Sequence, residues 1–421
     1  MQLGAFAIDE FKAYRQIPLA PDQRRFSVIA VVNPAKSTSE YFVMNGHIFG
    51  AINAVYNYNR RPLAVQAILE KCFWIVTDHY YDDRWVIEPM ETIESAAHTT
   101  LDVFQMLGIR VQEEKIQGPP VKFMEARKII PKDPTAVSTD PYQNPELLGV
   151  TFDLRNLKVK IQESRKTKLI AEMEGIISKK TLTAGHASKI KGKLQFATCS
   201  LFGRVGRSFM TPLSERQYEK IKRSDLHWPL EFALRNWIDI IDKGMPRPIS
   251  YRQLRPADAV WFTDGMSEGS ANHVGGVLFC WWRKTPAYFS VEVPQEIIDK
   301  WLPRKNQIAL VEIFASVILH HNFSGELFGK RVIGMIDSEC ALDALIKGVS
   351  KFGDVVQLLT IFWRDIADNQ ILWYGDKIPT DGNISDGVSR QDLKQAEELG
   401  WERVHVRLPE ILFTDRIMKR K

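Results

Sequence analysis

The stretch Cys72-Phe-Trp-Ile-Val-Thr-Asp-His-Tyr-Tyr-Asp-Asp-Arg84 decides how the rest of the chain is interpreted. Its apolar and aromatic part, Cys72–Val76, predicts a strand, and two adjacent aspartates, Asp82 and Asp83, follow it. Neighbouring carboxylates repel each other, and burying either is costly without a cation. The pair is therefore either a solvated acidic hairpin tip or a set of ligands for a hard metal ion such as Mg²⁺.

The composition is that of a globular protein. The chain has 421 residues, 45% of them hydrophobic and 25% charged, which suits two or three domains. It has no apolar run long enough to span a bilayer, and its first residues lack the pattern of a signal peptide. Four cysteines without paired spacing indicate neither a disulfide framework nor a zinc cluster. We expect a cytoplasmic or nuclear protein that is neither secreted nor membrane-bound.

The net charge of +5 hides a strong asymmetry along the chain. Residues 155–223 contain 17 Lys and Arg against 5 Glu, so the remainder of the chain is acidic in balance. A basic segment of this kind indicates either a surface that binds a polyanion such as nucleic acid or a solvated face of helical structure.

Hydrophobic periodicity predicts a mixed α/β (α+β) protein. An amphipathic helix is expected over Ile93–Leu107, and residues 160–245 are expected to be largely helical. After a boundary at Met245–Pro248, a new α/β pattern begins. The other segments that we expect to be regular are strands at Phe26–Val32, Leu147–Phe152, Ala259–Phe262, Val274–Trp282, Val332–Ile336 and Ile371–Tyr374, and helices at Ala51–Leu69, Ile308–Leu319, Leu358–Ile366 and Ser385–Leu399.

Three further residues accompany the Asp82–Asp83 pair. Asp9 ends a short apolar run, Tyr14 follows five residues later, and Gly50 precedes a predicted helix, where backbone N–H groups can face a ligand. Taken alone, Tyr14 is an ordinary core tyrosine and Gly50 a glycine at a helix start. The order and the spacing of the set are more specific than any member.

These residues resemble the palm of reverse transcriptases, with Tyr80–Asp83 as the YxDD box and Asp9 as the first aspartate. The phrase Lys12–Pro18 looks most like DIRS-type (tyrosine-recombinase) retrotransposons and their pararetroviral relatives. Two later stretches, Leu107-Gly108…Lys115 and Leu147–Val150, resemble the later palm motifs.

The resemblance implies that Asp9 and Asp82 bind two Mg²⁺ ions, with Asp83 in support, for two-metal phosphoryl transfer from dNTPs. It also implies that Tyr14 excludes a ribose 2′-OH, that Gly50 contacts the substrate, and that Lys115 lies near the leaving pyrophosphate. Such enzymes carry a long fingers segment before the first aspartate, whereas Asp9 lies eight residues from the start here. We therefore expect the fingers to be largely missing and polymerase activity to be impaired.

Four more acids stand at the ends or within the predicted elements of the C-terminal half: Asp264, Glu312, Asp337 and Asp386. Each alone is more often structural than catalytic. Their order, two strand-end aspartates, a helical glutamate and a final aspartate at a helix start, resembles the type 1 RNase H fold. The resemblance implies two Mg²⁺ ions at these four acids, with Mn²⁺ as the alternative, and hydrolysis of RNA in RNA–DNA hybrids. The histidine that many such enzymes carry before the last aspartate is absent, since none lies between His321 and His405.

The sequence thus predicts a retroelement polyprotein segment with a reverse transcriptase palm at 1–158, a basic, mostly helical thumb/connection at 159–250, an RNase H-like mixed-sheet domain at 256–400 and a tail at 401–421. The expected partners are RNA–DNA hybrid, template–primer duplex, dNTPs and other products of the polyprotein. Two alternatives remain open: a non-catalytic remnant that binds nucleic acid, and a palm that serves as scaffold for an active RNase H.

Overall fold

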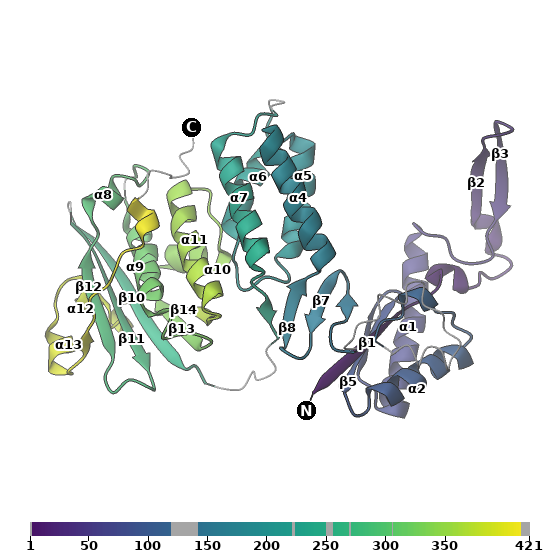
Figure 1. The fold of residues 1–421 in the computed structure, drawn as a ribbon, viewed down its shortest axis with the longest axis horizontal. Coiled ribbons are helices and arrows are strands. Elements are labelled where there is room, and N and C mark those ends of the chain that lie inside the picture. The colour runs from purple at the N-terminus through teal and green to yellow at the C-terminus, as the bar shows by residue number, and fades with distance from the viewer. Residues whose placement is uncertain are drawn as a thin grey trace. The chain divides into compact units, whose positions relative to one another are not determined.

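The structure is a computed structural model that describes residues 2–118, 142–220, 224–249, 256–268, 271–304 and 306–413. The chain forms two compact units, Met1–Gln162 and Glu163–Lys421, which are described separately. Both units mix helices with sheets, so the predicted mixed α/β class is confirmed (Figure 1). Within the described ranges, no helix is both long and apolar enough to cross a bilayer.

A three-stranded antiparallel sheet of order β1-β5-β4 lies at the centre of the first unit. Its residues pair so that Ile8 lies opposite Arg84 and Asp9 lies opposite Asp83. Helices α1 and α2 pack against this sheet, and the core includes Phe6. The elements of the unit are β1 (Leu3–Asp9), β2 (Val28–Asn33), β3 (Thr38–Val43), α1 (Ile52–Phe73), β4 (Thr77–Tyr80), β5 (Asp83–Pro89), α2 (Ile93–Met106), β6 (Glu146–Leu147), β7 (Val150–Asp153) and β8 (Lys158–Ile161).

Helix α2 confirms the helix expected from periodicity at Ile93–Leu107 except at its end. The apolar residues from Ile93 to Phe104 that share one face are buried, whereas Leu107 is 49% exposed. Leu107 follows the last helical residue, and Gly108 turns the chain away with φ +67°. The helix therefore ends before Leu107 can reach the core.

The strand predicted at Cys72–Val76 is wrong. Helix α1 continues through Phe73 and ends at Trp74, whose φ of 60° is left-handed, and strand β4 begins only at Thr77. The buried face of α1, which includes Val65 and Leu69, ends before this run, and Cys72 and Phe73 continue the helix with exposed side chains. The end of an established helix is thus extended in spite of the local preference of aromatic and β-branched residues for strands.

The strand predicted at Leu147–Phe152 is interrupted. The chain makes a two-residue turn at Leu148 and Gly149, with φ angles of 51° and 77°, and pairs β6 with β7. Positive φ at both central residues is typical of a tight hairpin, and glycine adopts it without strain. The strand is therefore two short strands of one hairpin.

The second unit begins with four helices, which confirms the largely helical structure expected for residues 160–245. These helices are α4 (Glu163–Lys179), α5 (Ala184–Ala197), α6 (Met210–Gln217) and α7 (Trp228–Lys243). Their shared interior contains Met173, Ile190, Leu234 and Trp237, each of which is 0% exposed. The burial of large apolar residues on facing helices holds this part together.

A six-stranded mixed sheet of order β14-β13-β10-β11-β12-β15 follows. Strands β11 and β10 are antiparallel, whereas β13 and β14 run parallel to β10. The elements are β9 (Arg247–Pro248), β10 (Ala259–Glu268), β11 (Ala271–Cys280), β12 (Ala287–Glu292), α8 (Gln295–Ile298), α9 (Ile308–Phe323), β13 (Arg331–Ile336), α10 (Glu339–Lys347), α11 (Gly353–Asp368), β14 (Leu372–Lys377), α12 (Asp386–Ser389), α13 (Lys394–Glu398) and β15 (Glu402–Arg403).

Helices cover both faces of this sheet. Gly265 of β10 lies against the backbone of α9. Thr263, which is on the same face of β10, forms a hydrogen bond of 3.0 Å with Ser316 of α9. Gly275 of β11 instead meets the backbone of α12 at Ser389. Since Gly275 pairs with Asp264, and successive strand residues face opposite sides, α9 and α12 lie on opposite faces.

Two boundaries in this unit differ from those expected. The strand expected to end at Phe262 continues to Glu268, because β11 pairs with all ten residues of β10. Asp264 is therefore inside a strand rather than after one. The single closing helix expected at Ser385–Leu399 is two short helices, α12 and α13, and the intervening Gln391 has φ 63°.

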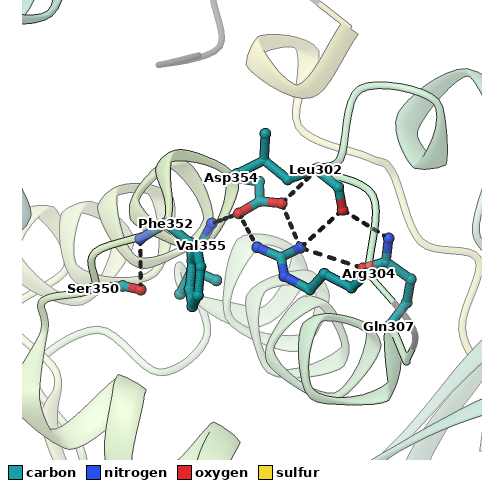
Figure 2. A network of polar contacts seen from close by, with 7 residues as sticks. All are labelled: Leu302, Arg304, Gln307, Ser350, Phe352, Asp354 and Val355. Atoms are coloured by element: carbon teal, nitrogen blue, oxygen red, sulfur yellow. Dashed lines mark hydrogen bonds and ion pairs between the residues drawn. The ribbon is translucent and has the colours of Figure 1, made fainter. Parts of the chain in front are cut away.

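A buried ion pair connects the starts of helices α9 and α11 (Figure 2). Asp354, in the first turn of α11, accepts hydrogen bonds from both terminal guanidinium nitrogens of Arg304 at 2.6 Å and from the backbone N–H of Leu302 at 2.8 Å. The side chain of Gln307, which precedes α9, donates to the carbonyl of Leu302 at 3.0 Å. This network therefore ties the segment that leads into α9 to the first turn of α11 by charge-assisted hydrogen bonds.

His320 of α9 is a buried titratable group without polar partners. It is 0% exposed, its ring lies 5.5 Å from that of Trp261 and 4.7 Å from that of Phe362, and no described residue bonds to either ring nitrogen. Burial lowers the pKa of His320 to about 3 from 6.5. The folded protein therefore holds this imidazole neutral.

We expect the stability of the protein to fall as the pH drops from about 6.5 towards 3. In this window the unfolded chain binds a proton at His320 and the folded chain does not, so this residue alone contributes a slope of about 1.4 kcal/mol per pH unit. Urea unfolding at a series of pH values measures it. His320→Leu, of similar volume, should show a shallower dependence; identical slopes in the two proteins would contradict the assignment.

Candidate functional sites

The register of two parallel strands places the first pair of acids. Thr263 of β10 lies opposite Ile336 of β13, so the residues that follow, Asp264 and Asp337, lie side by side at the same end of the sheet. Asp264 is 5% exposed, and Asp337 is half-buried. Adjacent parallel strands are separated by about 5 Å, which brings the two carboxylates within reach of one ion.

The third acid comes from helix α9. A Cβ placed on Gly265 would lie 2.8 Å from the backbone nitrogen of Glu312, so only glycine lets α9 approach strand β10 this closely. The result is that ligand oxygens of Asp264, Glu312 and Asp337 all lie within 4.8 Å of one another. Among the described residues, this is the one group of three such side chains that is gathered so tightly.

Two carboxylates of this cluster, those of Glu312 and Asp264, resist ionisation. Burial, followed by the charges of Asp264 and Asp337, raises the pKa of Glu312 to about 9. Burial is also the main cause that raises the pKa of Asp264 to about 6, with Asp337 and Asp386 adding to it. Without a cation, Glu312 is therefore protonated at neutral pH.

Two oxygens of the cluster have no partner in the described part of the chain. They are Oε2 of Glu312 and Oδ1 of Asp337, both shielded from solvent. Buried acceptors of this kind are costly unless they are bonded. An all-oxygen set of carboxylates with free acceptors is the chemistry that Mg²⁺ and Mn²⁺ require, so the residues fit the divalent metal implied by the sequence.

Asp386 lies beside the cluster rather than in it. It begins helix α12, and its carboxylate accepts a hydrogen bond from Nε of Arg390 at 2.9 Å. Its charge contributes to the raised pKa of Asp264, which places it nearby. The structure thus gathers Asp264, Glu312 and Asp337 tightly and leaves Asp386 partly exposed at the rim.

Sequence reasoning missed the residues that hold Asp264 in place. The hydroxyl of Ser389, which is fully buried, bonds to the carboxylate of Asp264. The side chain of Asn383 donates to the backbone carbonyl of Thr263 at 3.2 Å and so ties the loop before α12 to β10. The signal that could have found Ser389 is its spacing of three residues after Asp386, which puts both on one side of a helical turn.

A second set of acids lies at the end of the central sheet in the first unit. Asp9 and Asp83 are paired across β1 and β5, and the β4–β5 hairpin turns through Tyr81 and Asp82. Tyr81 has φ 55°, a left-handed conformation that costs a residue with a side chain about 1–2 kcal/mol. The backbone N–H of Glu10 donates to the carbonyl of Asp82 at 3.1 Å, which holds the turn against β1.

Lys115 supplies the positive charge of this site. Its ammonium lies 2.6 Å from Oδ2 of Asp9, and this hydrogen bond raises the pKa of Lys115. Burial raises the pKa values of Asp82 and Asp83, and the charge of Asp9 raises both further. The three aspartates and Lys115 are thus brought together, but one carboxylate is already neutralised by the chain itself.

Tyr14 lies at the border of this site. It is 9% exposed, its ring stacks on Tyr58 at 4.6 Å, and Phe49 packs against it at 5.0 Å. The charges of Tyr81 and Asp82, after burial, raise the pKa of Tyr14, so it is near the turn. Gly50 follows Phe49 with φ +94°, and no described residue lies within 4 Å of where its Cβ would be.

Buried charges beneath the site were not predicted. The guanidinium of Arg84, 2% exposed, donates to the carbonyl of Pro62 at 2.6 Å and so anchors the hairpin to α1. Glu10, 3% exposed, forms an ion pair with Arg61 of the same helix. Both contacts join residues that are distant in sequence, so no local sequence pattern predicts them.

No protein-family model matches the sequence, and no curated protein matches it. Two solved structures of a foamy viral protease–reverse transcriptase are similar to the chain, each with a TM-score of 0.43 and 14% identity. One is the "dRH" form in complex with double-stranded DNA, and the alignment covers 89% of this chain and 57% of that one. The other is a complex with RNA/DNA hybrid, with coverages of 91% and 45%. This chain thus spans about half the length of those proteins, and a likeness of this extent assigns no role to any residue.

We expect Mg²⁺ or Mn²⁺ to raise the thermal stability of the protein through the Asp264 cluster. Glu312→Gln should remove this response, because the ion loses a ligand. Without metal, the same variant should be more stable than the wild type by about 3 kcal/mol at pH 7. The wild-type glutamate is ionised in the unfolded chain and must bind a proton when the chain folds, whereas the amide does not titrate. Thermal unfolding with and without metal measures both effects. Asp343→Asn, which alters an exposed acid, is the control, and an unchanged metal response in Glu312→Gln would contradict the site.

Proposed function

We propose that the second unit is a metal-dependent nuclease that hydrolyses the RNA strand of RNA–DNA hybrids. The observation that carries this proposal is the cluster of Asp264, Glu312 and Asp337, with ligand oxygens within 4.8 Å and two buried acceptors without partners in the described chain. The resemblance of the four acids to type 1 RNase H supports the choice of substrate. Assignment to a retroelement of DIRS type, acting in the cytoplasm or nucleus, is part of the same proposal and rests on sequence motifs alone.

The protein's own residues prepare the site for this reaction. Ser389 fixes the rotamer of Asp264, and the close approach at Gly265 fixes the depth of Glu312. Because Glu312 has a raised pKa, its proton must leave when a cation arrives, so metal binding should release protons. Asp386, held by Arg390 at the rim, would be the fourth carboxylate available to the metal ions. Divalent ions held there would lower the pKa of the attacking water and stabilise the departing 3′-oxygen.

We expect Mg²⁺-dependent cleavage of RNA in an RNA–DNA hybrid by the purified chain. Asp264→Asn and Asp337→Asn should each lower the single-turnover rate by more than about 100-fold, the loss that removal of even an outer-shell partner can cause. Asp343→Asn should cleave normally. Intact hybrid after incubation with well-folded wild-type protein and Mg²⁺ would refute the proposed activity.

A second activity, nucleotidyl transfer from dNTPs at Asp9, Asp82 and Asp83, is proposed for the first unit. It is supported by the register that pairs Asp9 with Asp83 and by the adjacent Lys115 and Tyr14. Template–primer duplex and dNTPs would be its substrates, Tyr14 and Gly50 would border the nucleotide, and Lys115 would move from Asp9 to the leaving pyrophosphate. Because Lys115 already forms an ion pair with Asp9, this site is less suited to bind two metal ions than the Asp264 cluster is.

We expect primer extension by the purified chain to be weak, because one of the three aspartates is held by an internal cation and positioning contributes heavily to phosphoryl transfer. Asp82→Asn should abolish the residual incorporation of dNTPs and leave hybrid cleavage unchanged, whereas Asp264→Asn should do the reverse. Asp78→Asn in the neighbouring strand is the matched control. Loss of both activities in either single variant would contradict two separate sites.

A further inference from the structure

Two arginines occupy a tight turn between helices α5 and α6. The backbone N–H of Arg207 donates to the carbonyl of Arg204 at 3.1 Å, so the two residues lie at opposite ends of one turn. Both side chains are half-buried. The turn belongs to the same compact unit as the Asp264 cluster.

Two glycines clamp this turn against tryptophan rings. A Cβ on Gly203 would lie 2.7 Å from the ring of Trp363 on α11, and a Cβ on Gly206 would lie 2.6 Å from the ring of Trp237 on α7. Both glycines have positive φ, 57° and 83°, which other residues rarely adopt. The hydroxyl of Ser208 adds a hydrogen bond to that of Thr360 at 2.9 Å. The backbone that carries the two arginines is therefore fixed before any ligand binds.

Neither guanidinium group has a counter-ion among the residues that the structure describes. Across the described ranges, no hydrogen bond or ion pair reaches the side chain of Arg204 or Arg207. Burial, followed by the charge of Arg204, lowers the pKa of Arg207. Four other arginines of this unit, each at least partly buried, do have carboxylate partners. These pairs are Arg216 with Glu219, Arg283 with Glu326, Arg304 with Asp354, and Arg364 with Asp239.

The residues packed around the turn account for its backbone conformation, but they do not compensate the charges of its two arginines. A Cβ on Gly348 would lie 2.7 Å from Cβ of Arg204, so the stem of this arginine runs over the end of helix α10. That end is already capped, since the N–H of Gly348 bonds to the carbonyl of Ala344. Partial desolvation of two like charges without compensation is unfavourable, and an anion bound between them would remove the cost.

We infer that Arg204 and Arg207 form a preorganised binding site for a phosphodiester group of a nucleic-acid backbone. Guanidinium groups bind phosphate oxygens through paired N–H donors, and a fixed backbone reduces the entropy lost on binding. The choice of a polynucleotide over free phosphate rests on the proposed function, because a duplex held at this turn would be retained by the unit that carries the acid cluster.

The test uses the 421-residue chain with Asp264→Asn, so that hybrid is bound but not cleaved. Affinity for an RNA–DNA hybrid is measured by fluorescence anisotropy over a range of salt concentrations. Arg204→Ala/Arg207→Ala should lower the slope of log affinity against log salt by about 2 and weaken binding by roughly 10- to 100-fold at low salt. Arg204→Lys/Arg207→Lys should retain part of the affinity, because it keeps the charge and loses the planar donors.

The control is Arg235→Ala/Lys243→Ala, which removes the same charge from residues that are ion-paired on helix α7. Equal losses of affinity in the two alanine variants would overturn the inference, and so would unchanged affinity in Arg204→Ala/Arg207→Ala. Inorganic phosphate that binds at these arginines without displacing the hybrid would overturn it too. Thermal unfolding confirms that each variant is folded. Hybrid cleavage by the chain with Asp264 intact, with and without the arginine substitutions, separates the outcomes. Cleavage that does not depend on the arginines defeats this inference alone, whereas arginine-dependent binding without cleavage defeats the proposed nuclease alone.

Discussion

The candidate nuclease site depends on how closely helix α9 approaches strand β10. Gly265 permits a distance at which any side chain would strike the backbone of Glu312, and the parallel register of β10 and β13 sets Asp264 beside Asp337. These two constraints force three carboxylates into one buried volume, against their mutual repulsion. The surrounding contacts keep the arrangement in place: the Arg304–Asp354 pair at the start of α9, the Thr263–Ser316 hydrogen bond along it, and Ser389 from the opposite face.

The two acid clusters deal with their charge in different ways. In the first unit, Lys115 neutralises Asp9 directly, and the neighbouring aspartates are only half-buried. In the second, no lysine or arginine bonds to Asp264 or Glu312 in the described chain, so repulsion is relieved by protonation of Glu312. A cluster that the protein itself leaves unneutralised is the more strongly disposed to bind a divalent cation. The turn at Arg204 and Arg207 is the converse case, in which two cations have no acidic partner among the described residues.

The sequence predicted the candidate sites better than the elements that carry them. The order of Asp264, Glu312, Asp337 and Asp386 indicated one site, and the structure gathers three of the four, although Asp264 lies inside strand β10 rather than at its end. The strand expected at Cys72–Val76 failed because helix α1 extends through Phe73, beyond its last buried residue, Leu69. The closing helix failed because a turn at Gln391 divides it. Ser389, Arg84 and the Arg304–Asp354 pair could not be predicted, since each acts through a partner that only the tertiary fold brings near.

The most direct measurement is anomalous diffraction from crystals of the protein grown with Mn²⁺. The account predicts anomalous density bonded to carboxylate oxygens of Asp264, Glu312 and Asp337, with Glu312 ionised. Crystals in which Mn²⁺ is present elsewhere while this cluster remains free of metal, or in which a hydrogen bond joins Glu312 to Asp337 in its place, would contradict it.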